Sequence, residues 1–527
     1  MSSKMELSMK NNPYVLLVLA SLNSILLFKL SSSLGLIYLL AVLVAAVIIR
    51  EGRVNYGSLE ECGFPVIEPT LCLGSEPSYH KTVHHLADIE RYRKYGPIWG
   101  SYVGKLPHVF VADPDLIRQI FVKDFATHFG DRQDYEFGTD LMNEAIEFKK
   151  GEEWKTLRSF LSPLFSTSKL KHMSEVIANC AEEFANDMKA ECDEKGRVKL
   201  HCRDHFATRL IDMFAQTTLG IRMEDSKNPK NKFAQAFRTL MNEEGEYNWI
   251  YSLSLTYPIL SRFAPLFSEV TGMLDSTFRS VIKQRIESGS SSSKDFLDLL
   301  CDLWKRVAAG EYKELGFTET TVLAQCVLFF LGGYETTASS LSHVLYNMAQ
   351  HPEIQEKMRK ELENAVKNSK GGAIDHELIS DSNIPFITAC INESLRLQPS
   401  FYRPERICGK DWSHNGISIK KGTVVMLPAW AANRNPKFYP DEPDKFKPER
   451  FLPENKGKID PFAFTSFGFG PRNCIGMRFA YESMKLFTCN ILKQFRVELR
   501  PDTVLEYKGG TPIVIGFQPL YLDLVAR

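Results

Sequence analysis

Hydrophobic positions run without interruption near the N-terminus and recur with a mostly helical spacing over the rest of the chain. Two uncharged apolar stretches, 11–28 and 30–49, are separated by Lys29 alone, and Arg50 and Arg53 follow the second stretch. Each stretch is close to the ~20 residues that a membrane-spanning helix needs. We therefore expect residues 1–50 to form a transmembrane anchor, either as one span or as a two-helix hairpin.

Residues 51–75 differ from the apolar stretches because glycine and proline interrupt them, at Gly57, Gly63, Pro65 and Pro69. Such residues favour turns and irregular backbone, so we expect a linker over this range. The remaining residues, 76–527, contain no internal repeat or low-complexity tract. One large catalytic domain is the simplest organisation.

Helical periodicity dominates this domain, and we expect a mainly α fold with a small β-region. The segments 99–112 and 416–428 combine β-branched and turn residues, which predicts a hairpin in each. The longest helix is predicted to begin near Thr318, a suitable N-cap, and to end before Pro352. Its middle is apolar nearly all round, so it must pass through the core.

Residues 247–267 are rich in aromatic and aliphatic side chains and are broken by prolines. This composition suits a segment that rests on a bilayer surface, and it equally suits ordinary core packing. Both interpretations stay open.

Charge and cysteine content narrow the function classes. Lys plus Arg and Asp plus Glu each number 64, so the net charge is +0 and the basic field of a nucleic-acid-binding protein is missing. Eleven cysteines occur without a C-x-x-C pair, which indicates neither a disulfide framework nor a structural zinc site. We expect the catalytic domain to face a reducing compartment.

One cysteine stands in a distinctive context. Residues 467–476 read F-G-F-G-P-R-N-C-I-G, and a helix-forming stretch follows over 477–492. A cysteine on a glycine-flanked loop at a helix N-terminus has its thiolate stabilised by free backbone N–H groups and by the helix dipole. Cys474 is therefore a candidate thiolate ligand. We interpret the other ten cysteines as buried, inert thiols.

This segment resembles the haem-binding signature of the cytochromes P-450, F-x-x-G-x-R-x-C-x-G. The matching residues are Phe467, Gly470, Arg472, Cys474 and Gly476. The resemblance implies that Cys474 binds the haem iron, that Phe467 shields its sulfur, and that Arg472 pairs with a haem propionate. It also implies that the two glycines let the backbone approach the porphyrin.

Two further segments match this family in their order along the chain. Trp154 and Arg158 form W-x-x-x-R, one helical turn apart, and the resemblance implies that both reach one haem propionate. Residues 332–337, G-G-Y-E-T-T, resemble the oxygen-binding motif of the central helix, in which Thr336 with Glu335 relays protons. Without this context, the glycines would indicate close packing of helices, and the threonine would indicate a hydrogen bond to the backbone of its own helix.

Glu393 and Arg396 lie three positions apart, which on most helices gives only a solvated ion pair. Together with Arg450 in P-E-R-F they resemble the family's buried structural triad. Arg406 matches a further propionate-binding arginine.

Five basic residues near these segments form either a docking face for a redox partner or a set of scattered solvated charges: Lys149, Lys150, Lys155, Arg478 and Lys485.

The resemblance covers the chain after the linker and is closest to the animal microsomal branch of drug- and steroid-oxidising enzymes. It implies a monooxygenase with haem b as cofactor and O₂ as co-substrate. Electrons would come from NADPH through a separate NADPH–cytochrome P-450 reductase, because the chain has no flavin or nicotinamide motif. Cytochrome b5 is a further expected partner, and the expected location is the endoplasmic reticulum membrane with the catalytic domain in the cytosol.

The substrate pocket is expected to be apolar and to accept a lipophilic molecule of the xenobiotic, steroid or fatty-acid class. By resemblance its lining includes Leu331, Phe401, Tyr402, Ile513 and Val514. The chain departs from the family pattern in a hinge over 63–69 that has few prolines and in Asn433, where a histidine is common. Two other functions stay open: an isomerase or dehydratase of the same fold, and a haem protein that senses or carries a gas or lipid.

Overall fold

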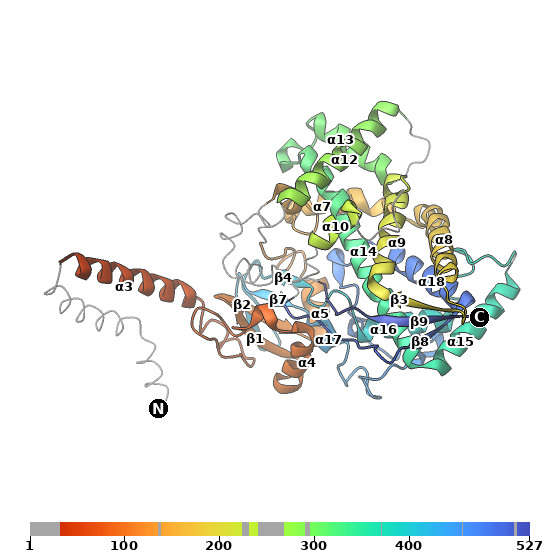
Figure 1. Ribbon diagram of the computed structural model, residues 1–527. Coiled ribbons are helices and arrows are strands. Elements are labelled where there is room, and N and C mark those ends of the chain that lie inside the picture. Colours follow the sequence, from red (N-terminus) through yellow and green to blue (C-terminus); the bar gives the residue numbers. More distant parts are fainter. Residues whose placement is uncertain are drawn as a thin grey trace.

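The computed structural model describes residues 32–134, 139–223, 231–240, 268–289, 296–369, 371–455, 457–510 and 514–527 (Figure 1). Helices make up most of the regular structure in these residues, which confirms the expected mainly helical fold with a small β-region. The aromatic segment 247–267 lies outside the described residues.

Long helices form the framework of the protein. They are α3 (Ser32–Arg53), α4 (His84–Tyr95), α7 (Gly151–Leu161), α8 (Thr167–Ala190), α9 (Cys202–Phe214), α10 (Lys232–Leu240), α12 (Ser268–Ser288), α13 (Phe296–Ala308), α14 (Glu319–Gln350), α15 (Pro352–Asn368), α16 (Pro385–Leu397) and α18 (Met477–Gln494). Short helices connect them: α5 (Pro114–Arg118), α6 (Asp140–Asn143) and α17 (Ala429–Ala432).

Single turns of 3₁₀- or π-helix occur between these elements. They are η1 (Tyr79–Lys81), η2 (Gln119–Lys123), η3 (Ser162–Phe165), η4 (Ala215–Leu219), η6 (Lys313–Leu315), η7 (Pro448–Phe451), η8 (Pro453–Asn455), η9 (Pro461–Ala463) and η10 (Gly470–Arg472). Of these, η10 lies directly before Cys474, where the chain turns toward α18.

The strands of the described residues form three small sheets. The largest has the order β1-β2-β7-β4, with β1 (Ile98–Val103), β2 (Leu106–Val111), β7 (Val424–Met426) and β4 (Glu405–Ile407). A second has the order β3-β9-β8, with β3 (Arg197–His201), β9 (Tyr521–Ala526) and β8 (Phe495–Leu499). The third pairs β5 (Trp412–His414) with β6 (Ile417–Ile419).

One of the two expected hairpins is present and the other is not. β1 and β2 pair in antiparallel fashion, which confirms the hairpin over 99–112. The hairpin over 416–428 is wrong, because β6 pairs with β5 whereas β7 lies between β2 and β4. The turn between β6 and β7 separates two sheets, since β7 finds partners from distant parts of the chain.

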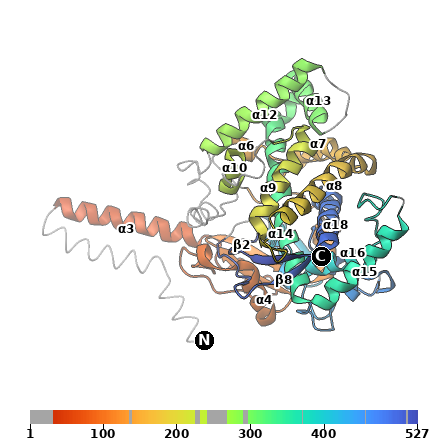
Figure 2. The same cartoon turned by 45° about the vertical axis from the view of Figure 1, so that its right-hand side comes forward.

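Helix α14 crosses the centre of the protein, as its apolar middle predicted (Figures 1 and 2). Thr318 is its N-cap and forms a capping box with Thr321, and Pro352 begins the next helix, α15. Most of its residues are buried. It packs against α9, α16 and α18, so a site beside α14 is enclosed by helices from distant parts of the sequence.

Helix α3 projects away from the β1–β2 side of the protein (Figures 1 and 2). Eight of its large apolar side chains are exposed: Leu36, Ile37, Leu39, Leu40, Leu43, Val44, Val47 and Ile48. Residues 1–31 of the expected anchor lie outside the described residues. No helix in the part of the chain that is described has both the length and the apolar character needed to cross a membrane.

Candidate active site

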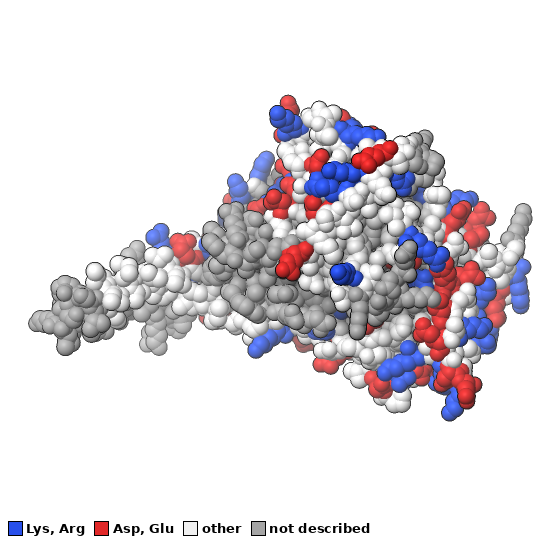
Figure 3. All heavy atoms as spheres, turned by 45° about the horizontal axis from the view of Figure 1, so that its top comes forward, with Lys and Arg blue, Asp and Glu red and all other residues white. Residues whose placement is uncertain are grey.

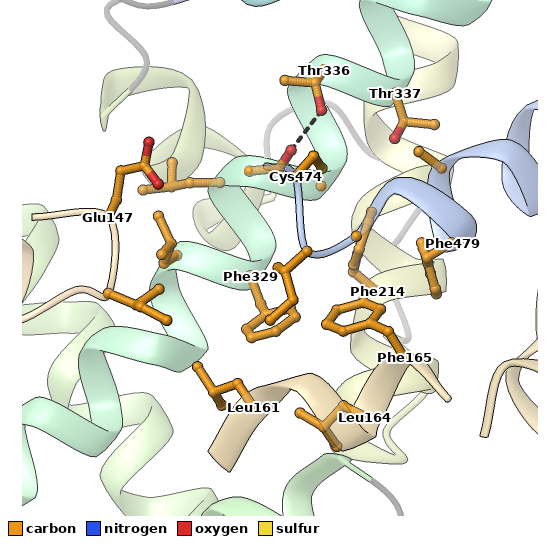
Figure 4. A pocket seen from close by; sticks show the side chains of 18 of the residues that line it. Glu147, Leu161, Leu164, Phe165, Phe214, Phe329, Thr336, Thr337, Cys474 and Phe479 are labelled. Atoms are coloured by element: carbon orange, nitrogen blue, oxygen red, sulfur yellow. Dashed lines mark hydrogen bonds between the residues drawn. The ribbon is translucent and has the colours of Figure 1, made fainter. Parts of the chain in front are cut away.

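A cavity of about 650 Å³ lies beside the middle of α14. Its walls come from α7, α14, the segment 395–406 and the loop 466–476 before α18 (Figure 4). Cys474 enters this cavity from the loop, and Thr336 enters it from α14. Two sequence motifs that are separated by more than a hundred residues therefore share one chamber.

The backbone around Cys474 depends on glycine. Gly470 has φ +71°, and a Cβ atom there would lie 1.9 Å from the carbonyl oxygen of Phe121, so no other residue fits. The Cys474 N–H donates to the Phe467 carbonyl oxygen at 2.9 Å, which closes the loop below the cavity. These contacts explain why the glycine and the cysteine occur at a set spacing.

Cys474 is exposed to the cavity, while protein atoms crowd around its sulfur. Burial raises the pKa of this thiol to about 11, and the backbone N–H of Gly476 acts in the opposite direction. A raised pKa favours the protonated thiol. Coordination to a metal ion deprotonates a thiol, so a metal ion at the sulfur would offset this effect of burial.

Arg158 and Arg472 extend from two sides toward the cavity. Arg158 on α7 donates from Nη2 to Asn473 Oδ1 at 2.9 Å, beside Cys474. Arg472 donates to the carbonyl oxygens of Gly130 and Lys149, at 2.8 and 2.7 Å. The guanidinium carbon of Arg472 also lies 4.4 Å from the centre of the Trp154 ring, so Trp154 supports this arginine directly.

Three further arginines line the same cavity: Arg132, Arg285 and Arg406. Arg406 is 1% exposed, and its Nε atom has no hydrogen-bond partner among the described residues. Burial and the neighbouring charges of Arg132 and Arg472 hold the pKa of Arg406 well below its usual range. A buried cation with an unused donor and like-charged neighbours is a site that favours an anion.

The charges around the cavity fit the two propionates of haem. Carboxylates pair with three of the five arginines: Glu147 with Arg132 at 2.5 Å, Asp131 with Arg472 at 3.3 Å and Asp298 with Arg285 at 3.3 Å. Arg158 and Arg406 form no ion pair among the described residues, so their two guanidinium charges are available to the two propionates. With a thiol below and unbonded guanidinium donors at the side, the residues present fit a haem group.

The glycines of the G-G-Y-E-T-T segment have different surroundings. A Cβ atom at Gly332 would meet nothing within 4 Å, whereas one at Gly333 would lie 2.1 Å from the Phe214 ring. Gly332 therefore opens space in the cavity, and Gly333 lets α9 approach α14. Thr336 lines the cavity and donates from Oγ1 to the Gly332 carbonyl oxygen at 2.6 Å (Figure 4).

Glu335 is 1% exposed and does not lie among the cavity-lining residues. Its carboxylate forms an ion pair with Arg203 of α9. Adjacent helical positions point in different directions, so Glu335 and Thr336 face different surroundings. Glu335 and Thr336 were expected to act together, but their side chains lie on different sides of α14.

A buried ion pair underlies the cysteine loop. Arg396 donates from Nε and Nη2 to the Glu393 carboxylate, both at 2.7 Å, and the ion-paired side chains are 0% exposed. Arg450 Nε lies 3.4 Å from the same carboxylate. Asn433 donates to the Arg396 carbonyl oxygen at 3.0 Å and accepts from the Thr465 N–H at 2.9 Å. The amide therefore connects α16 to the loop that carries Cys474.

The five residues that were expected to line the substrate pocket do not all lie at the cavity. Leu331, Phe401 and Val514 line the cavity, and Ile513 lies outside the described residues. Tyr402 is buried and packs near His85 instead, with ring centres 5.8 Å apart.

The five basic residues of the expected docking face do not form one exposed surface. Lys485 is buried and pairs with Asp381, and Lys149 pairs with Glu144 and Glu153. Lys150 pairs with Asp134. Lys155 and Arg478 are exposed.

Sequence reasoning missed Arg132, Glu147, Asn473 and Phe214, which all line the cavity. Asn473 is adjacent to the cysteine and accepts from Arg158, so its position in the motif was a signal. Arg132 and Glu147 lie in segments without a motif, and only the folded chain brings them together. Phe214 carried no signal, because its role depends on the absent side chain of Gly333.

Comparisons with known proteins agree with this geometry. The family model for cytochrome P450 matches residues 65–523. Lithocholate 6-beta-hydroxylase of Mesocricetus auratus is 32% identical over 484 residues, which cover 90% of this chain and 94% of that protein. Cytochrome P450 3A25 of Mus musculus is 33% identical with the same coverage. Cytochrome P450 3A7 of Homo sapiens is 32% identical over 486 residues, which cover 90% and 94% of the two chains.

Proposed function

Because this chain belongs to the cytochrome P450 family, we propose that the cavity beside α14 is the reaction chamber of a monooxygenase that oxidises lipophilic small molecules. Monooxygenases of this family use haem b, O₂ and electrons that NADPH supplies through a reductase. The observation that carries the proposal is that Cys474, five arginines and Thr336 line one largely apolar cavity. The reaction is RH + O₂ + two electrons + two protons, which gives ROH and water.

Cys474 is the residue that we propose would bind the haem iron. Haem with a thiolate ligand supplies the chemistry of O–O bond cleavage. Arg132, Arg158, Arg406 and Arg472 are the proposed partners of the propionates, since all four line the cavity and Arg158 and Arg406 have no carboxylate partner among the described residues. Trp154 is proposed to act through Arg472, whose guanidinium group it supports. The Glu393–Arg396–Arg450 cluster stabilises the fold below the loop and takes no part in the chemistry.

The proposed proton donor to the reacting oxygen is the Thr336 hydroxyl, because it lies in the cavity and carries an exchangeable proton. Its hydrogen bond to the Gly332 carbonyl holds Oγ1 in place. Glu335 can join this relay only if its carboxylate leaves Arg203. We therefore propose that Thr336 delivers the proton and that Glu335 replaces it after its carboxylate has left Arg203 and taken up a proton.

Apolar residues line the part of the cavity beside α14, including Leu331, Phe401 and Val514. A substrate would gain affinity there mainly by removing apolar area from water, and only a few polar groups could orient it. Steroids, fatty acids and many xenobiotics have this lipophilic character. Lithocholate, which appears in the name of one relative, belongs to this range of molecules.

We also propose that the protein is attached to the endoplasmic reticulum membrane, with the catalytic domain in the cytosol. The exposed apolar side chains of α3 support attachment, because water disfavours so large a contiguous apolar surface. Most of the described length of this helix is white in Figure 3, without charged residues. NADPH–cytochrome P-450 reductase and cytochrome b5 are the proposed electron donors, with Lys155 and Arg478 as the exposed cations of the expected docking face.

The proposal is tested with purified full-length protein, haem, NADPH and added reductase, incubated with a mixed lipid extract. A monooxygenase consumes NADPH and forms hydroxylated product only when reductase is present. Product formed without reductase would indicate an isomerase or dehydratase. Haem binding without NADPH consumption or product in any lipid fraction would indicate a sensor or carrier and would overturn the proposal.

A further inference from the structure

A tight turn over residues 70–74 stands beside the end of α3 and exposes two leucines. Leu71 and Leu73 are 46% and 55% exposed, and Cys72 lies between them. Thr70 and Gly74 pair across the turn, and Gly74 also pairs with Val103 at the end of β1. The leucines are therefore presented on a firmly bonded turn.

The turn is joined to α3 by a contact that only glycine allows. Gly52 is buried in the last turn of a helix whose other residues are largely exposed. A Cβ atom at Gly52 would lie 2.6 Å from Cys72 Sγ and 3.2 Å from Cys72 Cα. Cys72 has φ +61°, and its thiol donates to the Ile48 carbonyl oxygen at 3.8 Å. We call this contact the Gly52–Cys72 joint.

Hydrogen bonds hold the joint to the catalytic domain. The Tyr56 hydroxyl lies 3.1 Å from the carbonyl oxygens of Thr70 and Gly104, and it accepts from the Gly74 N–H at 3.0 Å. Asn55 Nδ2 donates to the Lys105 carbonyl oxygen at 3.0 Å. The chain after α3 is thus bonded both to the 70–74 turn and to the connection between β1 and β2.

The position of the Gly52–Cys72 joint along α3 indicates the environment of Leu71 and Leu73. Cys72 contacts the helix at Ile48 and Gly52, where its apolar run gives way to Arg50 and Arg53. Basic residues at the end of an apolar helix lie at the level of lipid headgroups. The leucines on the adjoining turn are then at the level where acyl chains begin.

We propose that the 70–74 turn is a second lipid contact and that the Gly52–Cys72 joint seats the catalytic domain on the bilayer at a set angle to α3. The inference rests on the proposed membrane attachment and adds to it a surface and an orientation. The occupant is a lipid bilayer, because the exposed leucines flank Cys72, which contacts α3 at the end of its exposed apolar run.

The contact is tested in full-length, haem-loaded protein bound to phosphatidylcholine vesicles with brominated acyl chains, which quench nearby tryptophans. Three reporters are compared after subtraction of the parent signal: Leu71→Trp in the turn, Ile37→Trp in α3, and Leu499→Trp in β8. Leu499 is a matched control, since it is 44% exposed. We expect Leu71→Trp and Ile37→Trp to be quenched to a similar degree and Leu499→Trp to stay unquenched.

The joint is tested in the same assay by Gly52→Ala, whose Cβ would meet Cys72. Quenching of Leu71→Trp should fall, while quenching of Ile37→Trp should not change. A second substitution, Cys72→Gly, removes the sulfur and suits the positive φ, so Gly52→Ala with Cys72→Gly should restore the quenching.

Two outcomes separate the inference from its premise. If Ile37→Trp is quenched but Leu71→Trp is quenched no more than Leu499→Trp, the second lipid contact is overturned and the membrane attachment is left intact. Absence of quenching at Ile37→Trp would overturn the attachment itself. Emission from Leu71→Trp that shifts with protein concentration in the absence of vesicles would assign the turn to a second copy of the chain, against the proposal.

Discussion

Replacing Glu393 by glutamine would leave a buried cation without its counterion. The Glu393 carboxylate accepts two hydrogen bonds from Arg396 and one from the Lys447 N–H, and the Glu393 and Arg396 side chains are 0% exposed. Arg396 otherwise donates only to backbone carbonyls among the described residues, including that of Asn433 at 2.8 Å. Breaking a buried pair from one side costs about 3–5 kcal/mol. We expect Glu393→Gln to lose that much stability, or roughly two to four powers of ten in the unfolding equilibrium.

The assay is urea unfolding of the haem-loaded protein, followed by the loss of the thiolate–carbonyl absorption band. Glu449→Gln is the matched control, because Glu449 forms an exposed ion pair with Lys357 at 3.6 Å. Such pairs contribute at most about 1 kcal/mol. Equal losses in the two variants would refute the reasoning, since burial of the Glu393–Arg396 pair would then have no energetic consequence.

Three further predictions concern the candidate active site, the buried His343 and the N-terminal anchor. Thr336→Ala should keep the haem content and the carbonyl spectrum but lower product by about 10²-fold or more, with the NADPH electrons recovered as hydrogen peroxide; unchanged product without extra peroxide would exclude the proton-donor role. Burial lowers the pKa of His343 to about 4, so the unfolded chain binds more protons than the folded protein between pH 6.5 and 4, and stability should fall as the pH falls. The His343 contribution is on the order of 2 kcal/mol at pH 5, and urea midpoints at pH 7 and 5 should therefore differ less in His343→Gln. Deletion of residues 1–50 should reduce sedimentation with membranes while the haem spectrum persists; loss of haem would count against a separate anchor.

Local chemistry explains which features could be predicted from the sequence. The closure of the loop around Cys474 and the ends of α14 depend on residues nearby in the sequence: a glycine with positive φ, the Phe467 carbonyl, a capping threonine and a following proline. The hairpin over 416–428 failed because strand pairing is decided by partners far away, and β7 gains more partners between β2 and β4.

The candidate site divides in the same way. Arg158 and Arg472 belong to short motifs, whereas Arg132 and Glu147 become neighbours only when their two segments meet at the cavity. The distinct surroundings of Glu335 and Thr336 also depend on tertiary structure, because Arg203 on another helix takes up the carboxylate. Residue type and spacing therefore indicated the chemistry, while the electrostatic balance of the cavity required the folded chain.

The sheet of β3, β8 and β9 has a consequence for how this protein is made. Arg197 of β3 pairs with Val525 of β9, so the strand must wait for residues near the other end of the chain. At about 5–20 residues per second, a ribosome needs roughly 15–65 seconds to synthesise the intervening segment. During this interval β3 has an unpaired edge, and the partly made chain is open to wrong strand partners. Newly synthesised chains should therefore depend on chaperones until β9 has left the ribosome.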